Sequence, residues 1–235
     1  MLMGAGRAAG RTGCAPAPVD EPMIGMTRMP KFFRRAAALA LFAFAGAASL
    51  DARAEPAASA TPMIDTFDHT LLGVMKDAVK LGYQGRYDRL QPVIRQVFNV
   101  PLMTQLVVGS SWSDWSKEQR DEVTDAFCRF IVATYARRFD GYSGEDFVVD
   151  GERASGNGTV VMTRLTRPKE APVTINYLVR ANGDGAPQVV DVYLTGTISE
   201  LATRRSEFGA VLQHEGYKGL LAALDKKASS QSSVR

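Results

Sequence analysis

Two different spacings of hydrophobic residues divide the chain beyond about residue 60. From residue 62 to 139, apolar side chains recur at intervals of three and four, which is the spacing of one helical face. From residue 145 the interval becomes two, which is typical of strands whose alternate side chains face a core. Helical spacing returns after residue 199. Because helices and strands occupy separate parts of the sequence, the pattern predicts an α+β domain.

Local signals place the ends of the predicted helices. Ser116 and Gln119 form a capping-box pair at the start of the fourth helix. Pro92 predicts a break or kink in the second helix, because proline lacks a backbone N–H donor. Gly216 interrupts the last helical stretch. The helices are expected over residues 62–80, 83–98, 99–108, 116–139, 199–215 and 217–227.

Short turns rich in Gly and Asn separate the predicted strands. The segments ASGNG at 154–158 and NGDG at 182–185 are typical of hairpin loops, so neighbouring strands should pair antiparallel. We therefore expect helices to pack on one face of a curved four-stranded antiparallel sheet. Its strands are expected over residues 146–152, 159–166, 173–180 and 188–195.

The N-terminal residues carry an export pattern. A basic stretch at 31–35 precedes an apolar run at 36–48, and the small-residue pattern Ala52-Arg53-Ala54 follows. A membrane anchor needs about 20 apolar residues, so this shorter run indicates a Sec-type signal peptide cleaved after Ala54 and export to the periplasm. The expected segments are a leader over 1–54 that includes a signal peptide at about 29–54, one domain over 55–228, and a disordered tail over 229–235.

The net charge changes once the leader is set aside. The whole chain holds 28 Lys and Arg against 25 Asp and Glu, a surplus that would suggest a nucleic-acid or anionic-membrane partner. Residues 1–54 contain seven of these basic and three of these acidic side chains, which leaves 21 basic and 22 acidic in residues 55–235. We therefore expect no nucleic-acid partner. Cys128 is the single cysteine after the leader, so no internal disulfide is expected.

Motifs for nucleotide or metal chemistry are missing from the sequence. Neither GxxxxGK[ST] nor GxGxxG occurs, and the two histidines, His69 and His214, lie in no metal-ligand spacing. We expect no cofactor and no metal. The remaining distinctive feature is a set of large apolar side chains, which fill an ordinary core or line a cavity between sheet and helices. Composition does not separate these two interpretations.

Two long segments resemble a known protein family. Residues 98–144 read FNVPLMTQLVVGSSWSDWSKEQRDEVTDAFCRFIVATYARRFDGYSG, and residues 189–224 read VVDVYLTGTISELATRRSEFGAVLQHEGYKGLLAAL. Both are similar to the MlaC, or toluene-tolerance, family of periplasmic lipid-binding proteins, and the likeness spans about residues 62–224. The stretches FDGYSGEDF and GTISELATRRSEF are similar to the HpnM branch, which is associated with hopanoid-producing bacteria.

The resemblance implies a carrier and not an enzyme. Such a protein holds a phospholipid or hopanoid in an apolar cavity between sheet and helices, and exchanges it with a membrane-bound transporter of the MCE/ABC type or a hopanoid exporter. We expect a monomer. Strand alternation then assigns the sheet wall of the cavity to Val173, Ile175, Tyr177, Val190, Val192 and Leu194. Helical spacing assigns the other wall to Phe98, Leu106, Val107, Phe127, Phe130 and Tyr135.

Two other classes of function stay open. A small exported α+β enzyme would need an inward-pointing acid or base, and Asp191 is the candidate because its strand is otherwise apolar. Asp191 could equally serve a structural hydrogen bond. A ligand-free adaptor of an envelope transporter would have a fully packed core. It would recognise its partner through basic pairs, Arg137-Arg138 and Arg204-Arg205, which could also contact lipid headgroups or simply be solvated.

Overall fold

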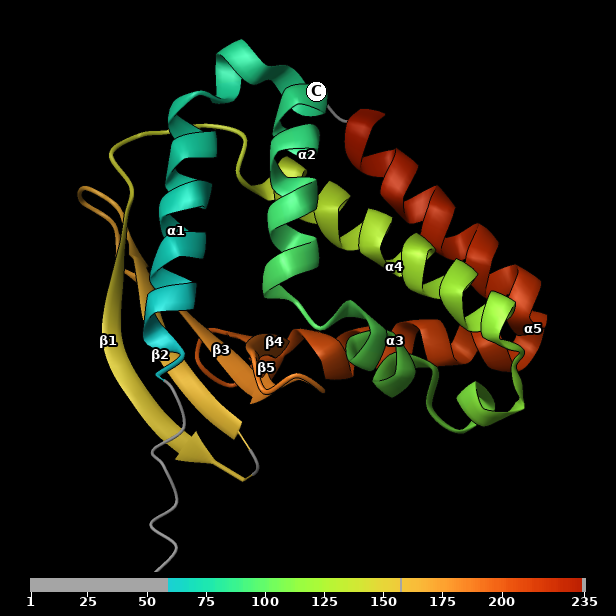
Figure 1. Ribbon diagram of the computed structural model, residues 1–235. Helices are drawn as coiled ribbons and strands as arrows, with labels where there is room; N and C mark the ends of the chain where they lie inside the picture. The colour runs from blue at the N-terminus through green and yellow to red at the C-terminus, as the bar shows by residue number, and fades with distance from the viewer. Residues whose placement is uncertain (1–58, 157, 234–235) are drawn as a thin grey trace, which may run out of the picture. The chain divides into compact units, whose positions relative to one another are not determined.

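The computed structural model describes residues 59–156 and 158–233, which form helices and one sheet (Figure 1). The expected leader and signal peptide lie outside the described residues. The helices are α1 (Thr61–Lys76), α2 (Ala78–Val97), α3 (Val100–Val108), the 3-10 helix η1 (Gly109–Asp114), α4 (Lys117–Arg138) and α5 (Glu200–Ser233). The strands are β1 (Asp146–Ser155), β2 (Gly158–Thr166), β3 (Val173–Ala181), β4 (Pro187–Leu194) and β5 (Ile198–Ser199).

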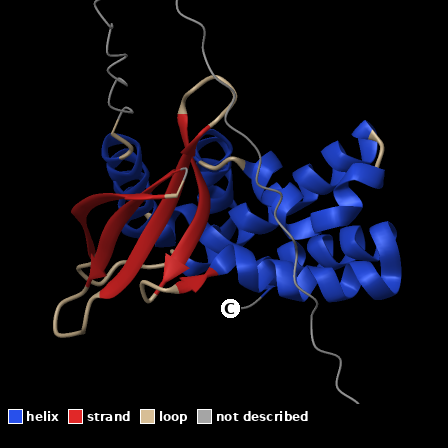
Figure 2. Ribbon diagram, turned by 90° about the horizontal axis from the view of Figure 1, so that it is seen from below, coloured by secondary structure: helices blue, strands red, loops and turns tan. Residues whose placement is uncertain are grey.

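The sheet has the order β1-β2-β3-β4-β5, and each strand pairs antiparallel with the next. The four predicted strands are present, and β5 adds two residues that pair with the end of β4. Figure 2 shows the twisted strands at one side of the described domain, with the helices behind and beside them. The predicted α+β arrangement is confirmed, with a fifth short strand that the sequence did not reveal.

The helices α1 and α2 run antiparallel beside the sheet (Figure 1). The backbone leaves helical geometry inside α2 at Gly82, whose φ of 60° is readily adopted only by glycine. Of the two outcomes predicted at Pro92, a break or a kink, the break does not occur, because α2 continues through that residue without such a departure. The chain therefore bends where glycine permits a positive φ, and the proline is accommodated within the helix.

Side chains cap the starts of both α3 and α4, and the predicted capping box of α4 is confirmed. The side chain of Asn99 accepts a hydrogen bond from the backbone N of Leu102 at 3.1 Å. At α4, the Ser116 hydroxyl accepts from the Gln119 backbone N at 3.3 Å, and the Gln119 side chain accepts from the Ser116 backbone N at 3.0 Å. This reciprocal pair satisfies N–H groups that the first helical turn leaves free.

The last helix folds back on itself. Gly216 has a φ of 66°, so α5 turns there and its second half returns along α4 (Figure 1). Arg129 of α4 and Asp225 of that second half form an ion pair at 2.7 Å. The helix continues to Ser233, so the described part of the predicted tail, residues 229–233, is helical and not disordered.

Aromatic rings occupy the centre of the core between α1, α4 and the sheet. Phe67 is completely buried, and its ring lies 5.4 Å from Phe98, 5.7 Å from Tyr135 and 6.1 Å from Tyr177, measured between centroids. These contacts join helices and sheet through large apolar surfaces, the main stabilising contribution in such a core. None of the helices in the described part of the chain has the length and apolarity that a bilayer crossing requires.

Candidate functional site

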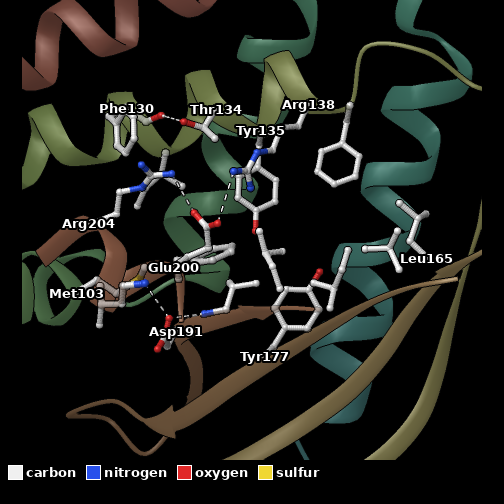
Figure 3. Close-up of a pocket in the computed structure, with 18 of the residues that line it drawn as sticks. Met103, Phe130, Thr134, Tyr135, Arg138, Leu165, Tyr177, Asp191, Glu200 and Arg204 are labelled. Carbon is white, nitrogen blue, oxygen red and sulfur yellow. Dashed lines mark hydrogen bonds and ion pairs between the residues drawn. The ribbon is translucent and has the colours of Figure 1, made fainter. Parts of the chain in front are cut away.

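A cavity of about 340 Å³ lies between the inner face of the sheet and the helices (Figure 3). Side chains of β2, β3 and β4 line it on one side, and residues of α1, α3, α4, α5 and the segment after α2 line it on the other. Its volume falls within the roughly 300–1,000 Å³ that pockets for small molecules usually have. Most of the lining is apolar, so the cavity suits a hydrophobic ligand.

Nine of the twelve residues predicted for the cavity walls do line it. The lining residues of α4 follow the spacing of one helical face, and those of β3 are alternate residues of the strand, as the sequence pattern predicts. The nine are Phe98, Phe127, Phe130, Tyr135, Val173, Ile175, Tyr177, Val192 and Leu194.

Val190 does not line the cavity because a β-bulge changes the alternation along β4. Leu178 lies opposite Asp191 and Val179 lies opposite Val189, which leaves Val190 as the extra residue. Val190 instead packs with Leu178 in a small apolar cluster separate from the main core. Strict alternation, on which the prediction depended, does not hold across such a bulge.

Leu106 and Val107 of α3 also lie outside the cavity lining. Val107 is buried in the main core and Leu106 is half-buried. Met103, one turn earlier in α3, reaches the cavity in their place. The helical period correctly gave the face of α3, but it carries no information about how far along the helix a cavity extends.

Twelve lining residues were not among the predicted cavity walls, although the sequence had singled out three of them, Arg138, Asp191 and Arg204, for other roles. A partial signal was available for α4, where residues 131, 134 and 138 continue the row that starts at Phe127 with intervals of four, three and four. The others come from elements brought together only by the tertiary fold. The missed residues are Met75, Met103, Ile131, Thr134, Arg138, Phe139, Leu165, Arg167, Asp191, Glu200, Leu201 and Arg204.

One part of the cavity border is ionic. Glu200, the first residue of α5, lies 2.9 Å from Arg204 and 3.6 Å from Arg138 of α4, measured between oxygen and nitrogen (Figure 3). Arg204 also contacts Glu207 at 2.9 Å, and its guanidinium lies 5.1 Å from the centre of the Phe130 ring. The cavity thus combines an apolar lining with charged groups at the start of α5.

Asp191 joins β4 to the start of α5. Its carboxylate accepts hydrogen bonds from the backbone N atoms of Val192 at 2.8 Å and Leu201 at 3.0 Å, and from the Ser199 hydroxyl at 2.6 Å. A carboxylate at a helix N-terminus satisfies free N–H groups and interacts favourably with the helix dipole. This geometry fits the structural interpretation of Asp191, because its oxygens are already occupied.

A second buried carboxyl, Asp68 of α1, contacts Tyr177 of the sheet wall but does not itself line the cavity. Its Oδ1 accepts a hydrogen bond from the Tyr177 hydroxyl at 3.0 Å, and its Oδ2 is buried without a hydrogen-bond partner among the described residues. Burial raises the pKa of Asp68 to about 7, an effect that the hydrogen bond from Tyr177 opposes. The same burial raises the pKa of the Tyr177 hydroxyl well above its usual value.

Comparison with known sequences identifies the family. The profile of the MlaC protein family matches residues 65–226. The chain belongs to the MlaC family. Among solved structures, this MlaC-family protein is similar to the phospholipid-binding protein from Ralstonia solanacearum, which was determined in complex with a phospholipid at 1.53 Å resolution. The two share 22% sequence identity and a TM-score of 0.65 over 74% of this chain and 99% of the other, which shows a common fold.

The candidate catalytic and metal-binding side chains of the MlaC-family chain can be placed in the structure. Within residues 59–156 and 158–233, no three His, Cys, Asp or Glu side chains are grouped so that they could hold a metal ion. His69 is largely exposed on α1, with Nδ1 2.7 Å from the Asp65 carbonyl oxygen. Asp191, the candidate for an enzymatic role, is held by its three donors. The rest of the cavity lining is mainly apolar, which suits the binding of a hydrophobic ligand.

Proposed function

We propose that this MlaC-family protein is a periplasmic carrier that shelters lipid chains in the cavity and passes them between membrane-bound transport components. The observation that supports this function most directly is the mainly apolar cavity of about 340 Å³ between sheet and helices. A ligand-free adaptor would have a packed core at this position. The phospholipid bound by the Ralstonia solanacearum protein of the same fold makes a lipid the first ligand to test.

The hydrophobic effect sets the free energy that a carrier must supply to keep lipid chains out of water. Burial of a methylene contributes about 0.8 kcal/mol, so a chain of about sixteen carbons gains on the order of 12 kcal/mol over exposure to water. A carrier must offer an environment of similar apolarity, and it needs no acid, base or metal to do so. Aliphatic and aromatic side chains from both walls supply that environment here.

The finer parts of the proposal concern compartment, ligand and partner. The export pattern supports a leader over 1–54, removed as the protein enters the periplasm, and a single lipid-binding domain over 55–228. The resemblance to the HpnM branch supports a hopanoid as the alternative to a phospholipid. The partner would be a membrane-bound transporter of the MCE/ABC type or a hopanoid exporter that connects with the outer membrane, and the carrier would act as a monomer.

Native mass spectrometry tests whether the protein carries a lipid. Protein from cells that express the full chain should show an added mass that organic extraction removes, and the extract identifies the lipid. Protein that arrives empty and also fails to take up a labelled phospholipid or hopanoid would contradict the carrier function. A ligand that turned over to product during incubation would favour the enzyme alternative.

Two residues of β3 provide a matched pair of variants. Ile175 lines the cavity and is 7% exposed, whereas Leu178 is 8% exposed and packs in the separate cluster with Val190. Ile175→Asp should abolish lipid co-purification because it places a charge against the chains, and Leu178→Asp should not. If either variant fails to fold, Ile175→Thr and Leu178→Thr give the same comparison with a smaller perturbation. Equal lipid content in the two folded variants would refute the assignment of this wall.

A further inference from the structure

We infer that the turn between α1 and α2, together with the loop after α4, docks onto the surface of an anionic lipid bilayer. The turn joins the two helices at one end of their antiparallel pair (Figure 1). The residues that carry the inference are Lys76, Val79, Lys80 and Tyr142, here called the docking tip, and none of them lines the cavity. The inference goes beyond the proposed function, because it concerns how the protein meets a membrane and not what fills the cavity.

Two hydrophobic side chains of the docking tip are exposed. Val79 is 96% exposed, the highest value for a large hydrophobic residue in the described part of the chain, and Tyr142 is 45% exposed. The Nζ atom of Lys76 lies 5.4 Å from the centre of the Tyr142 ring, so the loop lies beside the end of α1. A single exposed apolar residue is ordinary. An exposed aliphatic residue beside a tyrosine and lysines is the combination typical of membrane interfaces.

The backbone presents Val79 on a short, anchored segment. α1 ends at Lys76, and a single helical turn follows before the backbone leaves helical geometry at Gly82. Ala78 at the start of this turn is buried, whereas Val79 and Lys80 are exposed. The turn is therefore fixed to the core by one residue and carries its next two residues outward. Such a side chain can insert between lipid headgroups without any rearrangement of the fold.

The docking tip carries a surplus of positive charge. Neither Lys76 nor Lys80 forms an ion pair within residues 59–156 and 158–233. The acidic residues beside the docking tip in the sequence are already paired, since Asp77 and Asp140 each contact an arginine at 2.8 Å. The two lysines are thus free to interact with the negative surface of a membrane that contains anionic lipids.

The docking tip lies beside one end of the cavity. Met75 and Phe139 line the cavity, and they immediately precede Lys76 and Asp140 in the chain. Contact at the docking tip would bring this end of the cavity close to the bilayer. The path of a hydrocarbon chain through water would then be short, which lowers the cost of its exposure.

The size of the docking tip favours a lipid surface over a protein partner. A stable protein interface buries about 800 Å² on each partner and centres on a well-packed cluster of residues. Four side chains, two of them flexible lysines, offer far less than that. A bilayer is fluid and accommodates a shallow insertion, so a few apolar and basic side chains are enough for weak, reversible contact.

Vesicle sedimentation tests the docking tip. Protein purified from cells that express the full chain is mixed with vesicles of phosphatidylcholine alone, or of phosphatidylcholine and phosphatidylglycerol in equal parts. The native protein should bind the mixed vesicles more tightly, and raised salt should reduce this preference. The double variant Lys76→Gln, Lys80→Gln should weaken binding to mixed vesicles about 25-fold, because each lysine near an anionic surface contributes about fivefold. Val79→Ser should weaken it about tenfold through the loss of one buried aliphatic side chain.

Matched controls make the same chemical changes elsewhere on the protein. Lys218→Gln, Lys226→Gln removes two exposed lysines from the second half of α5, which form no ion pair among the described residues. Ile198→Ser removes an apolar side chain of β5 that is 56% exposed. Neither control should change vesicle binding by more than about twofold, because charges well beyond a Debye length from the bilayer are screened.

The location of protein and lipid after sedimentation separates docking from cargo uptake. Docking moves protein into the pellet, whereas uptake moves lipid into the supernatant with the protein. Equal sedimentation of the lysine variant and its control overturns the docking tip, and lipid uptake by that variant leaves the carrier function intact. Native protein that stays in the supernatant with both kinds of vesicle shows that the bilayer assignment is wrong and directs the search to an acidic protein. Protein that sediments as expected but takes up no lipid supports the docking tip and contradicts the carrier function.

Discussion

The buried Asp68 carboxyl should make the protein less stable as the pH rises, and Asp68→Asn should remove that dependence. Asp68 is 1% exposed on α1, accepts one hydrogen bond from Tyr177, and has a second oxygen without a hydrogen-bond partner among the described residues. Ionisation places a negative charge in this apolar setting with one donor to stabilise it. Burial therefore raises the pKa of Asp68 from 3.8 to about 7.

The magnitude and sign follow from the two pKa values. Below pH 3.8 the carboxyl is protonated in both states, and its effect on the free energy of unfolding is constant. Between pH 3.8 and about 7 the unfolded chain releases the proton while the folded protein retains it, so stability falls as the pH rises. A shift of about three pKa units corresponds to on the order of 4 kcal/mol, complete above about pH 7.

Asp68→Asn replaces the carboxyl with an amide that still accepts from Tyr177 and does not ionise. Its new N–H₂ donors have no evident partner, which costs about 1–3 kcal/mol. The protonated carboxyl carries a similar unsatisfied donor at low pH, so the two proteins should differ little at pH 4. At pH 8 the variant should be the more stable, and the difference in unfolding free energy should change by about 4 kcal/mol between these pH values.

Urea unfolding at a series of pH values measures this difference directly. Subtraction of the two profiles removes every other titrating group, because those groups are common to both proteins. Asp184→Asn is the matched control, since it makes the same chemical change at an exposed position in the β3–β4 turn. Its profile should follow that of the native protein. Parallel profiles for Asp68→Asn and the native protein would refute the buried, proton-retaining state of Asp68.

Three further changes should alter stability in known directions. Glu152→Gln should lower the free energy of unfolding by about 1 kcal/mol, because one Glu152 oxygen accepts hydrogen bonds from hydroxyl and backbone N–H groups at the start of α1. An unchanged melting temperature would contradict this prediction. Arg86→Met should lower the free energy of unfolding in urea by about 2 kcal/mol, because two buried carbonyl oxygens lose their donor. A variant as stable as the native protein would contradict this role of Arg86. Gly216→Ala should destabilise the protein by about 1 kcal/mol, because residue 216 has a positive φ that alanine adopts poorly. Gly209→Ala, within a regular part of α5, should stabilise the protein. Stability changes of the same sign in the two variants would exclude the positive φ as the cause.

Features governed by local sequence could be predicted well. The capping pair of Ser116 and Gln119 lies within one helical turn, and both of its hydrogen bonds form. The row on α4 that includes Phe127, Phe130 and Tyr135 depends only on the helical period, and all three line the cavity. Such features need no knowledge of partners elsewhere in the chain.

Features governed by pairing across the fold could not be predicted. Val190 was assigned to the cavity because the alternation of β4 hides the bulge opposite Leu178 and Val179. Arg138 and Glu200 lie on different elements, and their approach depends on how Asp191 fixes the start of α5 against β4. Sequence spacing carries no information about contacts between distant elements, so it predicted most of the apolar wall but not the ion pairs that Glu200 forms with Arg138 and Arg204.

The unfavourable position of Asp68 has a physical rationale in the cavity itself. Tyr177 lines the cavity with its ring, yet its hydroxyl donates to Asp68, which is not a lining residue. A phenolic hydroxyl without a partner would add a polar group that hydrocarbon chains could not satisfy. Asp68 provides the acceptor from outside the cavity, at a cost to stability that grows as the pH approaches 7. Tyr177→Phe removes the hydroxyl, so it should leave lipid uptake intact while raising the pKa of Asp68 further. Loss of uptake in a folded Tyr177→Phe protein would show that the hydroxyl contacts the ligand instead.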